Sequence, residues 1–177
     1  MNRIVITGAP GTGKTSIINF LKSKGYTCFE EFSRTLIKSK CEYRVGDSFF
    51  KKQKIFNTKI IEKRIIQYND SKKITNSKDN LIFFDRCIYD TYAYQKLEDN
   101  SFSFPQGKYV YKYQKVFILS PWKEIYVNDN ERLESFNKSK DIDKYIRLTY
   151  NHYNLMPNNV SKASLKNRVD YILSKCL

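Results

Sequence analysis

The 177-residue sequence has few of the residues that build metal centres and disulfide frameworks. Its four cysteines are Cys28, Cys41, Cys87 and Cys176, and they form neither a CxxC pair nor a zinc-type spacing. The one histidine, His152, cannot complete a metal cluster. These shortages argue against a zinc site and predict reduced, mostly buried thiols, as in a cytosolic protein.

Long hydrophobic runs are also missing, so no segment is predicted to span a bilayer. We expect no targeting segment before the first predicted strand at residues 3–7, and the sequence shows no internal repeat, low-complexity tail or linker. Hydrophobic residues make up 41% of the chain, enough for a substantial core. We therefore expect a single cytoplasmic domain over residues 1–177. The sequence leaves its oligomeric state open.

Acidic residues are outnumbered, with 18 Asp and Glu against 32 Lys and Arg, for a formal charge of +14. This surplus favours anionic partners such as nucleotides, nucleic acid or acidic membranes. However, lysines are spread along the chain without a dense basic run, which favours a generally basic surface over a specific partner. Nucleic acid is expected to bind only by non-specific attraction, because no nucleic-acid motif is present.

Strand-like and helix-like segments alternate along the chain, which predicts an α/β fold with a parallel sheet. Apolar, β-branched runs predict strands at residues 3–7, 26–29, 81–84 and 116–119, with a weaker one at 153–156. Amphipathic patterns predict helices at residues 14–24, 30–40, 49–68, 88–97, 141–151 and 165–176, and residues 69–80 are expected to be loop. In such a fold, ligands bind at the carboxyl ends of the strands.

A glycine-rich turn after the first strand matches the phosphate-binding pattern G-x-x-x-x-G-K-[ST] in full, from Gly8 to Thr15. Glycines let backbone N–H groups converge on phosphate oxygens, and the start of the next helix adds positive potential. In this pattern Lys14 contacts the β- and γ-phosphates, and the hydroxyl of Thr15 holds Mg²⁺. The predicted nucleotide-binding residues are Gly8, Gly11, Thr12, Gly13, Lys14, Thr15 and Ser16.

The third predicted strand ends at Asp85, the position of a Walker B acid that binds Mg²⁺ directly or through water. The alternative is that Asp85 caps the following helix. The next residue is Arg86, where many P-loop hydrolases carry a glutamate that activates water. An arginine cannot activate water but can hold a phosphate or carboxylate, which favours phosphoryl transfer over motor-type hydrolysis.

Two acidic residues, Glu30 and Glu31, follow the second strand, and Arg34 lies one helical turn beyond Glu31. A carboxylate here could accept the proton of an attacking substrate hydroxyl, and Glu31 is the preferred candidate because of its spacing to Arg34. Arg34 would then hold an anionic substrate. The equally weighted alternative is a helix start with favourable acids and an i,i+3 ion pair.

The segment after the fourth strand is polar, and residues 121–138 are predicted to form a flap. A mobile flap that brings an arginine onto the transferring phosphate is a known device in this chemistry. Arg132 is the catalytic candidate and Asp129 a substrate-binding candidate. An exposed loop arginine without a catalytic role is an equally weighted interpretation of Arg132.

Together these segments resemble small P-loop ATPases related to the ribosylnicotinamide kinase domain, and more distantly deoxynucleoside and thymidylate kinases. The matching pieces are ITGAPGTGKTSII, FEEFSRTLI, FFDRCIYD and VFILSPWKEIYVNDNERLESF. The resemblance implies a three-layer α/β/α fold with a five-stranded parallel sheet in the order 2-3-1-4-5. It also implies ATP and Mg²⁺, and it supports Glu31, Arg34, Asp85, Arg86, Asp129 and Arg132 as site residues.

The favoured function is a Mg²⁺-dependent small-molecule kinase, which moves the γ-phosphate of ATP to an unidentified nucleoside, nucleotide or similar acceptor. The alternative is an NTP-dependent switch that controls a protein or lipid partner. The sequence argues against a guanine-specific GTPase switch, because the N-K-x-D and D-x-x-G motifs of that class are missing.

Overall fold

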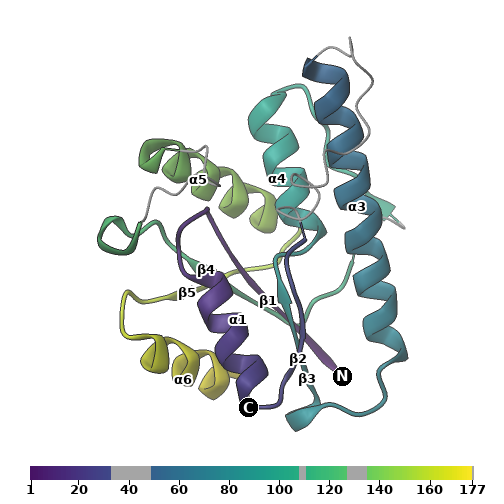
Figure 1. Ribbon diagram of the computed structural model, residues 1–177. Coiled ribbons are helices and arrows are strands. Elements are labelled where there is room, and N and C mark those ends of the chain that lie inside the picture. The colour runs from purple at the N-terminus through teal and green to yellow at the C-terminus, as the bar shows by residue number, and fades with distance from the viewer. Residues whose placement is uncertain (33–48, 108–110, 127–134, 177) are drawn as a thin grey trace.

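Five short parallel strands form the centre of the protein (Figure 1). The computed structural model describes residues 1–32, 49–107, 111–126 and 135–176, with the backbone alone for 49–54. The strands are β1 (Asn2–Gly8), β2 (Thr27–Phe29), β3 (Leu81–Asp85), β4 (Lys115–Leu119) and β5 (Asn158–Val160). Their order is β2-β3-β1-β4-β5, and every pair is parallel, which confirms the predicted order 2-3-1-4-5.

Helices cover both faces of this sheet, which completes the predicted three layers (Figure 1). One face carries α1 (Lys14–Ser23) and α6 (Leu165–Cys176). The other carries α3 (Phe49–Lys73), α4 (Ile88–Glu98) and α5 (Phe136–His152). Two short 3₁₀ turns, η1 (Lys78–Asn80) and η3 (Lys123–Ile125), lie in the connections. No helix in the described ranges is long and apolar enough to cross a membrane.

The central strands are buried on both faces, which explains their continuous apolar sequences. In β1, Ile4 and Ile6 pack in the core under α1 and α6, and Val5 packs in the core under α3, α4 and α5. All five residues of β3 are buried. Since the strands are parallel, their carboxyl ends meet at one edge of the sheet, and the candidate site residues follow these ends.

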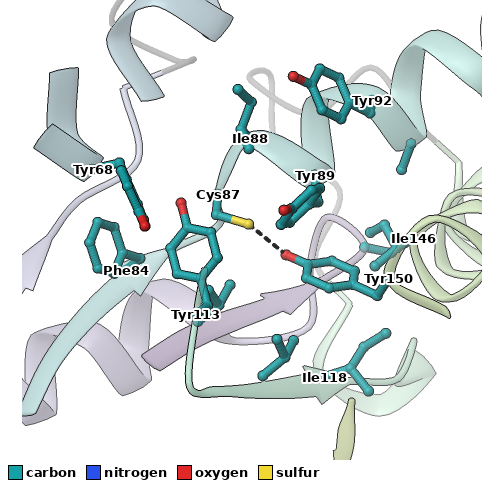
Figure 2. Close-up of a cluster of buried hydrophobic side chains, with 14 of the residues drawn as sticks. Tyr68, Phe84, Cys87, Ile88, Tyr89, Tyr92, Tyr113, Ile118, Ile146 and Tyr150 are labelled. Atoms are coloured by element: carbon teal, nitrogen blue, oxygen red, sulfur yellow. Dashed lines mark hydrogen bonds between the residues drawn. The ribbon is translucent and has the colours of Figure 1, made fainter. Parts of the chain in front are cut away.

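The core under α3, α4 and α5 contains five buried tyrosine rings among its aliphatic side chains, and Figure 2 shows them. Tyr89 and Tyr150 are completely buried, so their hydroxyl groups need partners inside the protein. The hydroxyl of Tyr89 donates to the carbonyl of Tyr111 at 2.7 Å, and that of Tyr150 donates to Asp90 at 2.7 Å. Tyr150 also lies 3.0 Å from the thiol of Cys87, the dashed contact in Figure 2. The rings therefore provide apolar packing without leaving these hydroxyls unsatisfied.

The prediction of a strand at residues 153–156 is wrong. Tyr153 ends α5, and the amide of Leu155 donates back to the carbonyl of Tyr150 at 2.9 Å. Asn154 adopts a left-handed φ of 55°, which closes this turn. The fifth strand is instead Asn158–Val160, whose side chains carry too little apolar pattern to mark it. It is placed by pairing with β4 and by the side chain of Asn158, which donates to the carbonyl of Val116 at 3.2 Å.

Three helix predictions also differ from the structure. α5 begins five residues before the predicted residue 141, because the hydroxyl of Ser135 caps it by accepting from the amide of Lys138 at 3.2 Å. α3 continues through Lys73 into the predicted loop at 69–80, since polar residues there occupy a helix surface. Residues 30–32 are not helical, and the rest of the predicted helix at 30–40 lies outside the described residues.

Candidate active site

The phosphate-binding pattern folds into a tight turn between β1 and α1. Gly8, Gly11 and Gly13 all have positive φ, at 143°, 78° and 88°, a region that side chains rarely adopt. A Cβ on Gly8 would also lie 2.3 Å from the carbonyl oxygen of Leu119 in β4. The turn therefore depends on glycine both for its backbone conformation and for its close approach to β4.

Lys14 begins α1 and turns its side chain back over this turn. Its Nζ donates to the carbonyl of Ala9 at 2.8 Å, and the hydroxyl of Thr12 donates to the same carbonyl at 2.9 Å. Burial and the nearby positive charge of Arg86 lower the pKa of Lys14 from 10.5 to about 7. The ammonium thus sits where a negative ligand would stabilise it strongly.

A side chain from the last helix supports the same turn. Arg168 in α6 is buried, and its Nη1 donates to the carbonyl of Thr12 at 3.3 Å. A Cβ on Gly13 would lie 2.9 Å from that nitrogen, so the guanidinium packs directly against the turn. The same guanidinium lies 5.6 Å from the ring centroid of Trp122. Sequence analysis did not select Arg168 for the site, because its partner is a backbone atom far away in the chain.

Asp85 ends β3 and is buried, with 2% of its surface exposed. Its Oδ1 accepts no hydrogen bond from the part of the chain that the structure describes. Burial, followed by the charge of Glu31, raises the pKa of Asp85 from 3.8 to about 6. The helix-cap alternative is wrong, since α4 is capped by Cys87, whose amide donates to Asp90 at 2.8 Å.

Arg86 pairs with one acid that follows β2 and with a second acid in the first turn of α4. Its Nε lies 3.2 Å from Oε1 of Glu31, and its Nη1 lies 3.4 Å from Oδ1 of Asp90. Burial disfavours its charge, but Tyr94, Glu31 and Asp90 outweigh that cost, and the net effect raises its pKa. Arg86 also has a left-handed φ of 66°, unusual for a side chain of this size. The sequence did not indicate that Arg86 would be paired with Glu31.

The predicted acids and the P-loop face a common pocket. Its lining residues are Thr15, Ile18, Asn19, Glu30, Glu31 and Asp85. Glu30 is the more exposed of the two glutamates and pairs with Lys22 at the surface, whereas Glu31 is only 21% exposed and faces Arg86. The structure therefore brings together residues that follow β1, β2 and β3, as expected from a parallel sheet.

These residues fit the triphosphate and magnesium ion that the motif implies. Magnesium is usually held in proteins by one or two carboxylates together with substrate phosphates and water. The buried Oδ1 of Asp85 and the hydroxyl of Thr15 line one pocket, and they supply this limited donor set. No cluster of three or more His, Cys, Asp or Glu occurs within the described ranges, so a site formed by protein ligands alone is not found there.

Three predicted site residues, Arg34, Asp129 and Arg132, lie outside the described residues, and their roles remain predictions. Ser16 follows Thr15 in the first turn of α1 and is exposed. Two side chains of α3 that were not predicted, Arg64 and Gln67, contact the backbone at the ends of β2 and β3. In the sequence they are two polar positions in a lysine-rich amphipathic helix, so no local signal separates them from surface residues.

The family model described as "AAA domain" matches residues 3–168 of this sequence. The chain belongs to the AAA domain family. No curated protein is similar to it at a significant level. Its membership of the AAA domain family confirms the predicted resemblance to P-loop NTPases.

Solved structures similar to this AAA domain protein include a nucleoside kinase and a nucleotide kinase. Deoxyadenosine kinase from M. mycoides with bound dATP is 18% identical, aligns over 99% of both chains and gives a TM-score of 0.69. Thymidylate kinase from Candida albicans is 16% identical over 98% of this chain and 90% of its own, with a TM-score of 0.68. NadR protein in complex with NR is 15% identical over 99% of this chain and 50% of its own, with a TM-score of 0.68. At these identities the likeness establishes the fold alone.

Proposed function

We propose that this protein is a Mg²⁺-dependent kinase that transfers the γ-phosphate of ATP to a hydroxyl or phosphate group of a nucleoside, nucleotide or similar small molecule. The observation that carries the proposal is the pocket beside the P-loop, where Glu31 and Asp85 face the same space as Thr15. Kinases need a carboxylate on the acceptor side and an acid near the metal, and the two strand ends provide one each.

The residue after Asp85 favours transfer over hydrolysis. Arg86 cannot serve as a base, and its guanidinium is paired with Glu31. This pairing holds the Glu31 carboxylate beside the pocket, where it could accept the proton of an acceptor hydroxyl. The likeness to nucleoside and nucleotide kinases agrees with this choice.

In the proposed reaction, the triphosphate binds the turn from Gly8 to Thr15, and Lys14 turns from Ala9 to the phosphates. The acceptor oxygen forms a bond to the γ-phosphorus, the bond from that phosphorus to the β–γ bridging oxygen breaks, and ADP leaves. Glu31 takes the proton of an attacking hydroxyl. Thr15 and Asp85 would hold magnesium, which would supply positive charge to the phosphates. Arg34, Asp129 and Arg132 remain candidates for holding substrate and stabilising the transferring phosphate. The flap predicted at 121–138, which includes Asp129 and Arg132, also remains a prediction, except that residues 136–138 belong to α5.

The proposal predicts that ATP binding takes up a proton above pH 7. In the free protein, Lys14 loses its proton near pH 7, because burial and Arg86 lower its pKa. A bound polyphosphate stabilises the ammonium, so its pKa rises and the affinity for ATP falls as pH increases from 7 to 9, by up to about tenfold per unit. Calorimetry at pH 8 in two buffers of different ionisation enthalpy measures the uptake. Lys14→Met should abolish it, and equal heats for the wild type in both buffers would contradict the lowered pKa.

The function is tested with labelled ATP and a panel of acceptors that covers ribonucleosides, deoxynucleosides, their monophosphates and ribosylated pyridines. We expect Mg²⁺-dependent transfer to at least one member, at a rate well above hydrolysis. If water is the sole acceptor throughout, the kinase proposal fails. Nucleotide-dependent capture of a protein or lipid partner would then support a regulatory NTPase.

A further inference from the structure

One turn of α3 contacts the backbone at the ends of β2 and β3, next to the proposed site residues Glu31 and Asp85. Arg64 is 3% exposed, and its Nη1 donates to the carbonyl of Asp85 at 2.7 Å and to that of Arg86 at 3.3 Å. The backbone it contacts includes the left-handed residue Arg86, a conformation that persists only where surrounding contacts enforce it. Arg64 therefore helps to hold the turn in which Asp85 and Arg86 lie.

The same guanidinium reaches the end of β2 through a second side chain. Nη1 of Arg64 donates to Oε1 of Gln67 at 3.2 Å, and Nε2 of Gln67 donates to the carbonyl of Glu30 at 2.9 Å. The guanidinium of Arg64 also lies 4.8 Å from the centroid of the Phe32 ring. Residues on both sides of Glu31 thus contact the same turn of α3.

These contacts form a closed ring, because Arg86 pairs with Glu31 at 3.2 Å on the pocket side. The ring matters because β2 is only three residues long, and its pairing with β3 ends at Phe29 and Phe84. Beyond that pair, the sheet ladder no longer fixes the distance between the two strand ends. Gln67 and Arg64 supply a connection at that point.

We infer that Arg64 and Gln67 are positioning residues that hold Glu31 and Asp85 at a fixed separation across the acceptor side of the site. The inference rests on the proposed kinase function. Neither residue lines the pocket. Both act through backbone carbonyls, so their loss should impair the chemical step more than the binding of either substrate.

The sharper test is Gln67→Leu, because Gln67 is half-buried and the change removes one amide while keeping similar volume. We expect kcat to fall by about 10- to 100-fold, since small displacements of a catalytic group carry such costs. The affinity for ATP and the KM of the acceptor should stay within about twofold. The matched control is Asn57→Leu on the same helix, which removes an amide that contacts Glu98 at 3.3 Å, and it should leave kcat unchanged.

A second measurement does not depend on activity. Hydrogen exchange at the amides of residues 30–32 should quicken in Gln67→Leu but not in Asn57→Leu, because Gln67 donates to the carbonyl of Glu30 whereas Asn57 donates to Glu98. Arg64→Lys keeps the charge but lacks the planar guanidinium that places Nη1 on the carbonyls of Asp85 and Arg86, and it should also quicken exchange at residues 85–87.

Two results would overturn the inference. One is unchanged exchange and unchanged kcat in Gln67→Leu. The other is a variant whose KM for the acceptor rises while kcat stays constant, because that pattern indicates direct contact with the acceptor. If the wild type phosphorylates no acceptor, the proposed function fails, whereas exchange at residues 30–32 still decides whether Gln67 positions this segment.

Discussion

Asp85→Asn is expected to lower the rate of phosphoryl transfer by about 10²- to 10³-fold, the usual cost of removing a group that stabilises transition-state charge. The change keeps the shape of the side chain but removes the negative charge that would hold magnesium. Because the buried Oδ1 of Asp85 accepts no hydrogen bond from the described residues, the structure offers no other evident use for that charge. Steady-state rates at several magnesium concentrations measure the effect.

The same variant should be at least as stable as the wild type in the absence of ligands. Burial and Glu31 raise the pKa of Asp85 from 3.8 to about 6, so carrying the carboxylate at pH 7 costs about 3 kcal/mol. The sign follows from the raised pKa, because the folded state favours the protonated acid and loses stability as pH rises towards 6. The neutral amide avoids this cost. Thermal unfolding at pH 7, with and without Mg²⁺ and ATP, should show a smaller ligand-induced gain for the variant.

Asp79→Asn provides the control for both measurements. Asp79 lies in η1 just before β3, is exposed, and accepts a hydrogen bond from the hydroxyl of Tyr26 at 2.7 Å. Asp79 therefore lies near the start of β3, whereas Asp85 lies at its end. The Asp79→Asn variant should retain full activity. Magnesium-dependent transfer at an undiminished rate in Asp85→Asn would contradict the metal role of Asp85.

The parts of this site that the sequence predicted are those encoded by neighbouring residues. The P-loop is a continuous motif, and Asp85 directly follows four apolar residues that can only be a buried strand in this context. Since the strands are parallel, strand-end position was enough to predict that Glu31 and Asp85 would meet. The family resemblance added the strand order.

The parts that were missed depend on contacts between distant segments. Arg64 and Arg168 donate to backbone carbonyls 21 and 156 positions away. Because every residue has a backbone carbonyl, the residue type does not indicate which one accepts the bond. The fifth strand was misplaced for a related reason, because Asn158–Val160 is specified by its pairing with β4 rather than by its own apolar pattern. Asp90 was overlooked as well, and two of its four partners, Thr7 and Tyr150, come from β1 and α5 rather than from the neighbouring residues 86 and 87.

Glu31→Gln is expected to lower kcat by about 10²- to 10⁴-fold, the usual contribution of a general base. The amide keeps the volume of the side chain and can still contact Arg86, but it cannot accept a proton from an attacking hydroxyl. ATP is held by the P-loop, so its affinity should change by less than about twofold. Single-turnover measurements separate the chemical step from binding.

The neighbouring glutamate makes this test specific. Glu30 lines the same pocket, but its side chain is 55% exposed and pairs with Lys22, so Glu30→Gln should leave kcat within about twofold. A loss of kcat in Glu30→Gln, together with full activity in Glu31→Gln, would identify Glu30 as the general base in place of Glu31. Full activity in both variants would mean that the acceptor arrives already ionised, as a phosphate does at neutral pH. The pair of variants therefore also distinguishes a hydroxyl acceptor from a phosphate acceptor, because only the hydroxyl has a proton that must be removed during transfer.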